Sequence, residues 1–362
     1  MPGTEPVRLD LIDNAERIMR ICNSCRYCEG YCAVFPAIER RQTFLDGDLN
    51  YLANLCYNCS ECYYACQYAP PHEFAVNVPK LLAEIREKSY RRYAWPGALA
   101  NETAVWLLIA GCLVLSILFA IVAGAQSMGQ PGGDFYRIVP HRLMVWAFGG
   151  VSIFVLLAFA GGFVRFWHNA GEHLRDFLNP GALVRALRDV LTLHYLDGGG
   201  GGCTYPGERQ SQSRRWLHHF TFYGFALCFG STTTAAFYHY ALGWKAPYGY
   251  LSVPVILGTF GGAGIVVGTL GLLWLKRRRN TETQPGGQSG MDFAFLGLLF
   301  LASASGLLLL ALRQATAMGP LLIVHLGIVL ALFLTLPYGK FVHAIYRSAA
   351  LVKFALERSR AA

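Results

Sequence analysis

Eight cysteines near the N-terminus repeat one spacing twice. Each run follows the pattern C-x2-C-x2-C-x3-C, and the two runs use eight of the chain's eleven cysteines: Cys22, Cys25, Cys28 and Cys32, then Cys56, Cys59, Cys62 and Cys66. Three cysteines at i, i+3 and i+6 on a tight turn supply three thiolates from one side, and a fourth thiolate must come from elsewhere. The pattern predicts two [4Fe–4S] clusters.

The two runs are expected to exchange their last cysteines. In two-cluster ferredoxins the fourth cysteine of each run ligates the other cluster. The first cluster is therefore assigned to Cys22, Cys25, Cys28 and Cys66, and the second to Cys56, Cys59, Cys62 and Cys32. One departure from the bacterial pattern is that Ala33 and Gln67, rather than proline, follow the fourth cysteines.

Structural zinc and disulfides are the alternatives for these cysteines. Zinc sites usually combine two CxxC pairs rather than three cysteines in one run. Disulfides are rare in the reducing cytoplasm, and the first twenty residues have neither the apolar stretch nor the cleavage site of a secretory signal peptide. The sequence favours iron–sulfur clusters in a cytoplasmic head.

Helices are the elements expected to position the cysteines. Apolar residues at helical spacing predict a helix over 8–21 that leads into Cys22, and a second helix within 33–55 that ends at Cys56. The expected fold class is all-α. A cytoplasmic α-helical ferredoxin-like head with two clusters over residues 1–100 is followed by a membrane domain over 101–362.

The chain as a whole is too apolar for an ordinary soluble protein, since 54% of all residues are hydrophobic, 15% are charged and the mean hydropathy is +0.34. Six apolar stretches each approach or exceed the roughly 20 residues that span a bilayer. They predict a six-helix transmembrane bundle over about 103–125, 141–164, 217–241, 251–275, 292–312 and 320–343.

The distribution of basic residues predicts the topology. Of the 31 lysines and arginines, 27 fall before the first span, after the last, or in the even-numbered connections, which places both termini on the cytoplasmic side of a bacterial inner membrane. The net charge of +9 is thus a topology signal rather than a sign of nucleic-acid binding. The partner that the charge and hydropathy indicate is the lipid bilayer.

Two glycine-rich segments need separate interpretations. The long cytoplasmic loop 165–215 contains five glycines before Cys203 and is either a flexible surface loop or a docking or cofactor-facing loop near the head. The GGAG at 261–264 lies inside an apolar stretch, where small residues favour close helix packing over dinucleotide binding.

Histidines in the apolar stretches are functional candidates, because polar groups in hydrocarbon are costly. The sixth stretch carries His325 and His343, which are eighteen residues apart and would share one face of a continuous helix. The third carries His218 and His219 at its inner end and His239 at its outer end.

Antiparallel spans would pair these histidines at two depths. His239 is expected to meet His325 near the outer surface, and His343 to meet His218 near the inner one. Two bis-histidine pairs predict one or two b haems, because neutral imidazole is a suitable axial ligand. His219 is the alternative to His218, and the secondary candidates are His141 and His168. The competing interpretation is that these histidines are interfacial and bind nothing.

No acidic or basic residue lies at the centre of any predicted span, which argues for electron rather than proton-coupled solute transfer. The chain also has no flavin or nicotinamide fingerprint and no acid–base or nucleophile constellation. We therefore assign no catalytic residues, and expect an electron-transfer subunit whose substrate chemistry occurs on a partner.

Three segments resemble the TcuB (CitB) family of tricarballylate and citrate utilisation membrane iron–sulfur proteins. They are CRYCEGYCAVFPAIERR, LANLCYNCSECYYACQYAPPHEFAVNVPK and GGGGGCTYPGERQSQSRRWLHHFTFYGFALCFGSTTTAAFYHY. The resemblance covers essentially the whole chain, and this family is similar to the C-terminal half of the fused cobalamin-pathway protein CobZ. The spacing of His325 and His343 around PYGKFVH is more remotely similar to the haem-binding gamma subunits of respiratory nitrate reductases.

The resemblance implies a specific partner protein and a direction of electron transfer. Members reoxidise the reduced FAD of a tricarballylate dehydrogenase-like flavoprotein, acting on tricarballylate or a related tricarboxylate, and deliver the electrons to membrane quinone. Two alternatives stay open. The chain could be the membrane arm of a different soluble flavoenzyme, such as one in cobalamin-pathway oxidation, or a haem-free redox-sensing membrane anchor.

Overall fold

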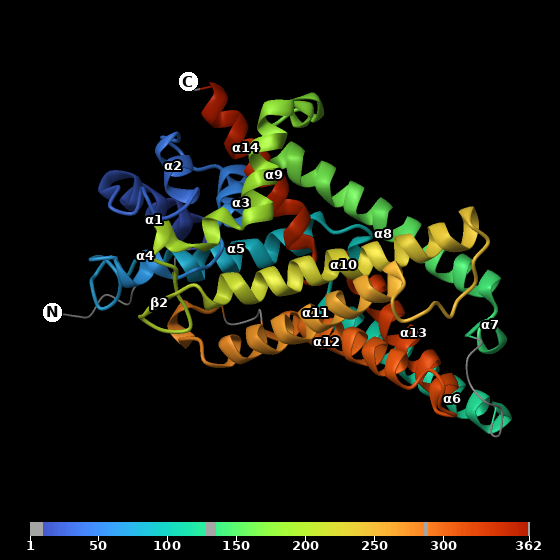
Figure 1. Ribbon diagram of the computed structural model, residues 1–362. Coiled ribbons are helices and arrows are strands. Elements are labelled where there is room, and N and C mark those ends of the chain that lie inside the picture. Colours follow the sequence, from blue (N-terminus) through green and yellow to red (C-terminus); the bar gives the residue numbers. More distant parts are fainter. Residues whose placement is uncertain (1–9, 128–134, 286–288, 361–362) are drawn as a thin grey trace.

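Helices make up nearly all of the regular structure in the computed structural model, which describes residues 10–127, 135–285 and 289–360 (Figure 1). The sheet found in these residues is one short hairpin, in which β1 (Cys203–Thr204) pairs antiparallel with β2 (Gln210–Ser211). This agrees with the all-α prediction. Helices α1 to α5 form a head, and long helices extend away from it (Figure 1).

The head helices present the cysteine runs at their ends. Their bounds are α1 (Leu11–Cys25), α2 (Val34–Glu39), α3 (Asp46–Leu55), α4 (Glu61–Tyr64) and α5 (Val78–Tyr93). The two predicted helices are present, although residues 8 and 9 lie outside the described residues. Helix α1 ends where Arg26 takes a positive φ of 54°, and α3 ends directly before Cys56. The side chain of Asn77 caps α5 by accepting a hydrogen bond from the backbone N–H of Lys80 at 3.2 Å.

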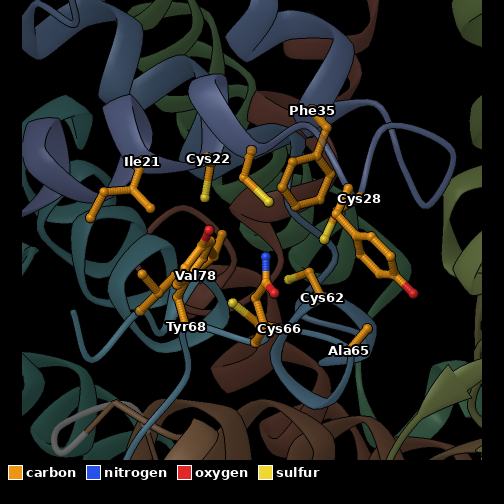
Figure 2. Close-up of a pocket in the computed structure, with 13 residues that line it drawn as sticks. Ile21, Cys22, Cys28, Phe35, Cys62, Ala65, Cys66, Tyr68 and Val78 are labelled. Atoms are coloured by element: carbon orange, nitrogen blue, oxygen red, sulfur yellow. The ribbon is translucent and has the colours of Figure 1, made fainter. Parts of the chain in front are cut away.

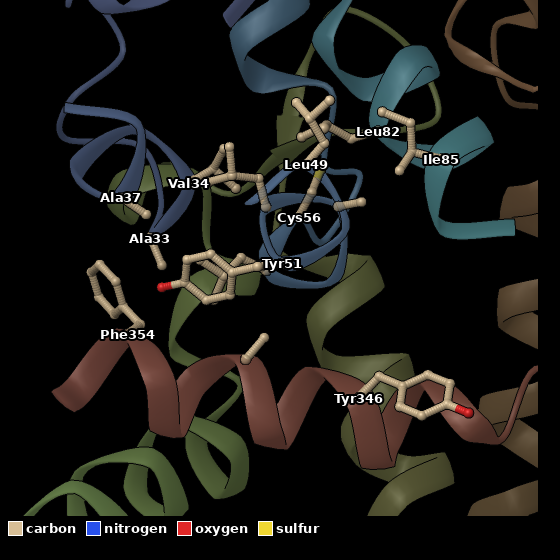
Figure 3. Close-up of a cluster of buried hydrophobic side chains, with 14 of the residues drawn as sticks. Ala33, Val34, Ala37, Leu49, Tyr51, Cys56, Leu82, Ile85, Tyr346 and Phe354 are labelled. Atoms are coloured by element: carbon tan, nitrogen blue, oxygen red, sulfur yellow. The ribbon is translucent and has the colours of Figure 1, made fainter. Parts of the chain in front are cut away.

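The last helix, α14 (Val342–Arg360), belongs to the core of the head. Figure 3 shows Tyr51 of α3 facing Phe354 of α14, and both side chains are buried. The Tyr51 hydroxyl donates to Glu357 Oε2 at 3.0 Å, and Arg41 pairs with the same carboxylate at 2.5 Å. The chain therefore returns to the head at its C-terminal end, which a division of the sequence at residue 100 does not anticipate.

Five helices in the described residues are long and apolar enough to cross a membrane. They are α6 (Glu102–Ser127), α8 (His141–Asn169), α11 (Val253–Arg277), α12 (Ser289–Ala311) and α13 (Met318–Thr335). They overlap five of the six predicted spans and are consistent with a multi-pass membrane protein.

The predicted third span falls on α10 (Ser213–Ala241), which is 29 residues long but is not one of the five sufficiently apolar helices. Polar side chains, including the run Thr232–Thr234, lower its hydropathy. The six-helix bundle therefore stays a prediction.

Helix α10 packs closely against α11 through glycines. A Cβ added to Gly224 would lie 2.8 Å from the carbonyl oxygen of Gly261, and one added to Gly261 would lie equally close to the carbonyl of Gly224. Backbones can approach this closely only where side chains are absent. The prediction of close packing for the GGAG segment is confirmed.

The predicted sixth span is wrong at its inner end. Helix α13 stops at Thr335, and α14 begins only at Val342. Pro337 lacks a backbone N–H, and its ring would clash with the carbonyl of the residue four positions earlier, so the helix cannot continue. His325 and His343 therefore lie on different helices, and the argument that placed them on one helical face fails.

The loop 165–215 is structured and packed on the head. It contains η2 (Leu174–Leu178), α9 (Pro180–Thr192), η3 (His194–Leu196), η4 (Gly198–Gly200) and the hairpin. Cys203 has 0% exposure and packs in a cluster with Tyr57 and Cys59 of the head. The loop lies beside the second cysteine run rather than free in solvent. The remaining short helices are η1 (Gly97–Leu99), α7 (Phe135–Ile138) and η5 (Thr281–Thr283).

Candidate metal centre

A cavity of about 280 Å³ in the head gathers the first predicted ligand set. Cys22, Cys25, Cys28 and Cys66 line it, and Cys62 joins them. Figure 2 shows the labelled cysteines pointing into one space, two from the α1 side and two from the α4 side. The fold therefore allows Cys66 of the second run to join Cys22, Cys25 and Cys28 of the first run as a ligand of one cluster.

The walls of this cavity are largely apolar, which disfavours the charged thiolate form of Cys22 and Cys28 when no metal is bound. Burial, reinforced by the neighbouring cysteines, raises the pKa of Cys22 and of Cys28 to about 12. A metal that binds there must displace these protons, because the thiolate is the ligand. The converging thiols and the available volume fit an iron–sulfur cluster.

The spacing of these groups does not suit a single metal ion. Throughout the described residues, no three His, Cys, Asp or Glu side chains converge closely enough to hold one ion. A zinc ion needs its thiolates about 2.3 Å from one point. Each thiolate of a cubane binds a different iron, so the sulfur atoms stand further apart.

The second predicted set lies together in an adjoining, tighter space. Cys32, Cys56, Cys59 and Cys62 line a cavity of about 10 Å³. The four thiols match the donor set of a second cluster, but their side chains must rotate outward to admit one. Cys62 lines both cavities, so the two sites are immediate neighbours.

Four arginines hold the loop that carries the second run. Arg86 of α5 and Arg347 of α14 both donate to the carbonyl oxygen of Cys56, at 2.6 and 2.8 Å. Arg214 of α10 donates to the carbonyls of Tyr57 and Asn58 at 2.9 and 2.8 Å. Arg279, after α11, donates to Asn58 Oδ1 at 2.7 Å. We call Arg86, Arg214, Arg279 and Arg347 the arginine cage.

The sequence interpretation missed the arginine cage. Two of its members stand four residues from predicted haem-ligand histidines, Arg214 before His218 and Arg347 after His343. That i, i+4 spacing puts each arginine on the same helical face as its histidine. This spacing is the sequence feature that could have indicated Arg214 and Arg347.

The predicted inner histidines meet. The rings of His218 and His343 have centroids 6.1 Å apart and are nearly perpendicular, at 88°. The Nδ1 of His343 bonds the carbonyl of Lys340 at 2.5 Å, which leaves Nε2 as the free ring nitrogen. His219 instead contacts the rings of Trp216 and Tyr223.

The predicted outer histidines have different neighbours. The ring of His239 stacks on that of His141 with centroids 4.1 Å apart. His325 Nδ1 bonds Ser305 Oγ of α12 at 2.9 Å. The rings of His239 and His325, both in the described part of the chain, are not in contact, because one faces α8 and the other α12. His168 is exposed at the end of α8. All haem assignments stay predictions.

Two family models match the chain. The Fer4-like domain of citrate utilization protein B covers residues 15–92, and citrate utilization protein B itself covers residues 96–362. Citrate utilization protein B of Escherichia coli is 49% identical over 352 residues, which are 95% of this chain and 92% of that protein. No solved structure matches the chain. The Fer4-like match contains all eight cysteines of the two runs.

Proposed function

Because the chain belongs to the citrate utilization protein B family, we propose that it is a membrane electron-transfer protein for a tricarboxylate-oxidising flavoenzyme. It reoxidises the reduced FAD of a tricarballylate dehydrogenase-like partner and passes electrons through two [4Fe–4S] clusters and b haem to the quinone pool. The chain contributes no substrate-level catalytic residue. It resides in the bacterial inner membrane with both termini in the cytoplasm.

The observation that carries this proposal is the short connection from the cysteine cavities to a histidine pair. Arg214 and Arg347 bind the second cysteine loop, and His218 and His343 lie four residues away on the same helices. Four residues on a helix are about 6 Å along its axis. A route from the second cysteine loop to the two imidazoles thus runs through Arg214 on α10 and Arg347 on α14.

Each residue set has a separate task. Cys22, Cys25, Cys28 and Cys66 hold the cluster of the larger cavity, and Cys56, Cys59, Cys62 and Cys32 hold the inner one. When bound, the clusters supply one-electron transfer, which divides the two electrons of a reduced flavin. His218 and His343 ligate the inner b haem, and His239 ligates the outer one with His141 or His325.

The first cavity is where electrons enter. Tyr27 lines it and is 67% exposed, and five of its cysteines are only partly buried. The second set lies deeper, since Cys56 and Cys59 are buried. A soluble donor can therefore approach the first set more closely than the second.

The deciding experiment measures iron, acid-labile sulfide and haem per polypeptide on the anaerobically purified chain, with a reduced-minus-oxidised spectrum. We expect about eight non-haem irons, about eight sulfides and one or two b haems, each of which adds one iron to the total. Eight irons without haem would mean that quinone takes electrons directly from a cluster, or that the chain is a redox-sensing anchor. A chain that binds no iron would refute the proposal.

The partner is tested by reconstitution. Quinone reduction in vesicles that contain the chain should depend on the flavoprotein and on tricarballylate or a related tricarboxylate. Turnover with an unrelated flavoenzyme, and none with tricarboxylates, would assign the chain to that other enzyme.

A further inference from the structure

The arginine cage concentrates positive charge around one short loop. Its members come from α5, α10, α14 and the segment after α11, and all four bond residues 56–58. Arg86 is 3% exposed, and the other three are partly buried. Within the described ranges, none of the four forms an ion pair with a carboxylate.

Unpaired buried cations are costly unless an anion lies among them. The cost is visible at Arg279, where burial and the charges of Arg214 and Arg86 lower the guanidinium pKa to about 10. The loop between these cations carries Cys56 and Cys59, whose thiolates would supply negative charge to a bound cluster. The arginine cage is therefore complementary to an anionic cluster at the second site.

The charge of a cluster becomes one unit more negative when it is reduced. Nearby positive charge stabilises the reduced form more than the oxidised form, and this raises the reduction potential. Burial alone would act in the opposite direction, because it disfavours the more highly charged state. The arginine cage offsets that penalty at the more buried of the two sites.

A hydrogen bond to a ligand sulfur adds to the effect. The backbone N–H of Asn58 donates to Cys56 Sγ at 3.3 Å. Such a bond draws electron density from the sulfur and favours the reduced cluster. The thiol of Cys203, on the glycine-rich loop, packs in the same buried cluster as Cys59 but donates to the carbonyl of Leu196 at 3.4 Å.

The first cysteine run has no comparable surroundings. Among the residues that the structure describes, the guanidinium bonded to the loop 22–28 is that of Arg26, which is exposed and donates to the carbonyl of Asn23 within the same loop. Its charge is screened by solvent. The two sites therefore differ in electrostatic surroundings although their cysteine spacing is the same.

We propose that the arginine cage sets the reduction potential of the second cluster above that of the first, which directs electrons from the open cavity toward the histidine pair. This inference rests on the proposed function, because it needs both clusters. The step moves one electron from the first cluster to the second. No bond forms or breaks, and no proton is transferred.

Replacement of Glu61 should change the reduction potential in the direction opposite to replacement of an arginine. Its side chain is 5% exposed, and Oε1 accepts a hydrogen bond from Gln210 Nε2 at 2.6 Å. It directly precedes Cys62, which lines both cavities, and its negative charge also acts on the thiol of Cys28 in the first set, so it opposes reduction at either site. Glu61→Gln removes that negative charge with little change in shape.

The experiment is a redox titration of the two reduced-cluster EPR signals in the full chain, purified anaerobically in detergent. Cys25→Ser removes the first signal and so identifies the second. We expect the second signal to have the higher midpoint. Arg214→Gln should lower its reduced-to-oxidised ratio about tenfold at fixed potential, a shift of about 59 mV for one electron. Arg214→Lys should shift it less, and Glu61→Gln should shift it upward.

The outcomes separate the inference from the proposed function. Two signals with the second midpoint below the first, or equal shifts in Arg214→Gln and Arg214→Lys, would overturn the inference and leave the relay intact. A native chain without iron would refute the relay itself. If Arg214→Gln loses iron, Glu61→Gln still decides the sign, and a downward or absent shift there contradicts the electrostatic role.

Discussion

His218 on α10 and His343 on α14 face each other with ring centroids 6.1 Å apart. The two residues are far apart in sequence, and each lies one helical turn from an arginine that bonds the second cysteine loop. Helices α10 and α14 thus bring the same two residue types to the same place. This convergence links the cysteine head to the long helix α10.

Replacement of His343 should remove the inner haem. His343→Ala deletes one of the two facing imidazoles, so haem per polypeptide should fall by about one equivalent while the non-haem iron of the clusters is retained. The measurement is a pyridine haemochrome assay beside an iron assay. His168→Ala is the matched control, because His168 is exposed and should leave haem unchanged. Equal haem in both variants would exclude His343 as a ligand.

His239 has two candidate partners, His141 and His325, as the second ligand of the outer haem. His239 stacks on His141, whereas His325 bonds Ser305. If the stacked pair supplies the outer ligands, His239→Ala and His141→Ala should each lower haem, and His325→Ala should not. Loss of haem in His325→Ala with none in His141→Ala would support the pairing predicted from the sequence instead. The readout is haem per polypeptide in each single variant.

Local spacing was enough to group the cysteines that line each cavity, because three of the four predicted ligands in each set lie within seven consecutive residues. Pro337 shows why the last span was misjudged: hydropathy continues past it, but its missing N–H ends the helix. The meeting of His218 and His343 was anticipated although the helix assumed for it was wrong. The arginine cage could not be foreseen, because its members come from four segments that only tertiary packing unites.

The contact between α10 and α11 should tolerate no side chain at Gly261. A Cβ there would lie 2.8 Å from the carbonyl of Gly224, so Gly261→Ala must push the helices apart, at a cost on the order of 1–3 kcal/mol. The thermal midpoint of the detergent-solubilised chain should fall. Gly297→Ala, where an added Cβ meets nothing within 4 Å, should not lower it. Equal midpoints in the two variants would contradict the close packing.

The iron-free head should lose stability in alkaline solution. Burial raises the pKa of Cys22 and Cys28 from 9.0 to about 12, so the folded state holds their protons more tightly than the unfolded state. Their contribution is complete below pH 9 and declines as pH rises from 9 to 12. Urea unfolding of the iron-free chain across this range should show the decline. A Cys22→Ala/Cys28→Ala variant should show a shallower one, and an equal slope would assign the effect to other groups.

The most direct prediction concerns Cys25, which lines the larger cavity with the other thiols of the first set. Cys25→Ser replaces a thiolate ligand by a hydroxyl, which is a poor ligand for the cluster's iron. The chain should then insert into the membrane normally but hold about half the native iron and sulfide. Flavin-to-quinone turnover should collapse, because the entry site is lost while the inner site remains. Cys112→Ser is the matched control, since Cys112 lies on α6 outside both runs and its replacement should change neither iron nor turnover. Native turnover in Cys25→Ser would show that electrons bypass the first cavity, and native iron would show that Cys25 is not a ligand.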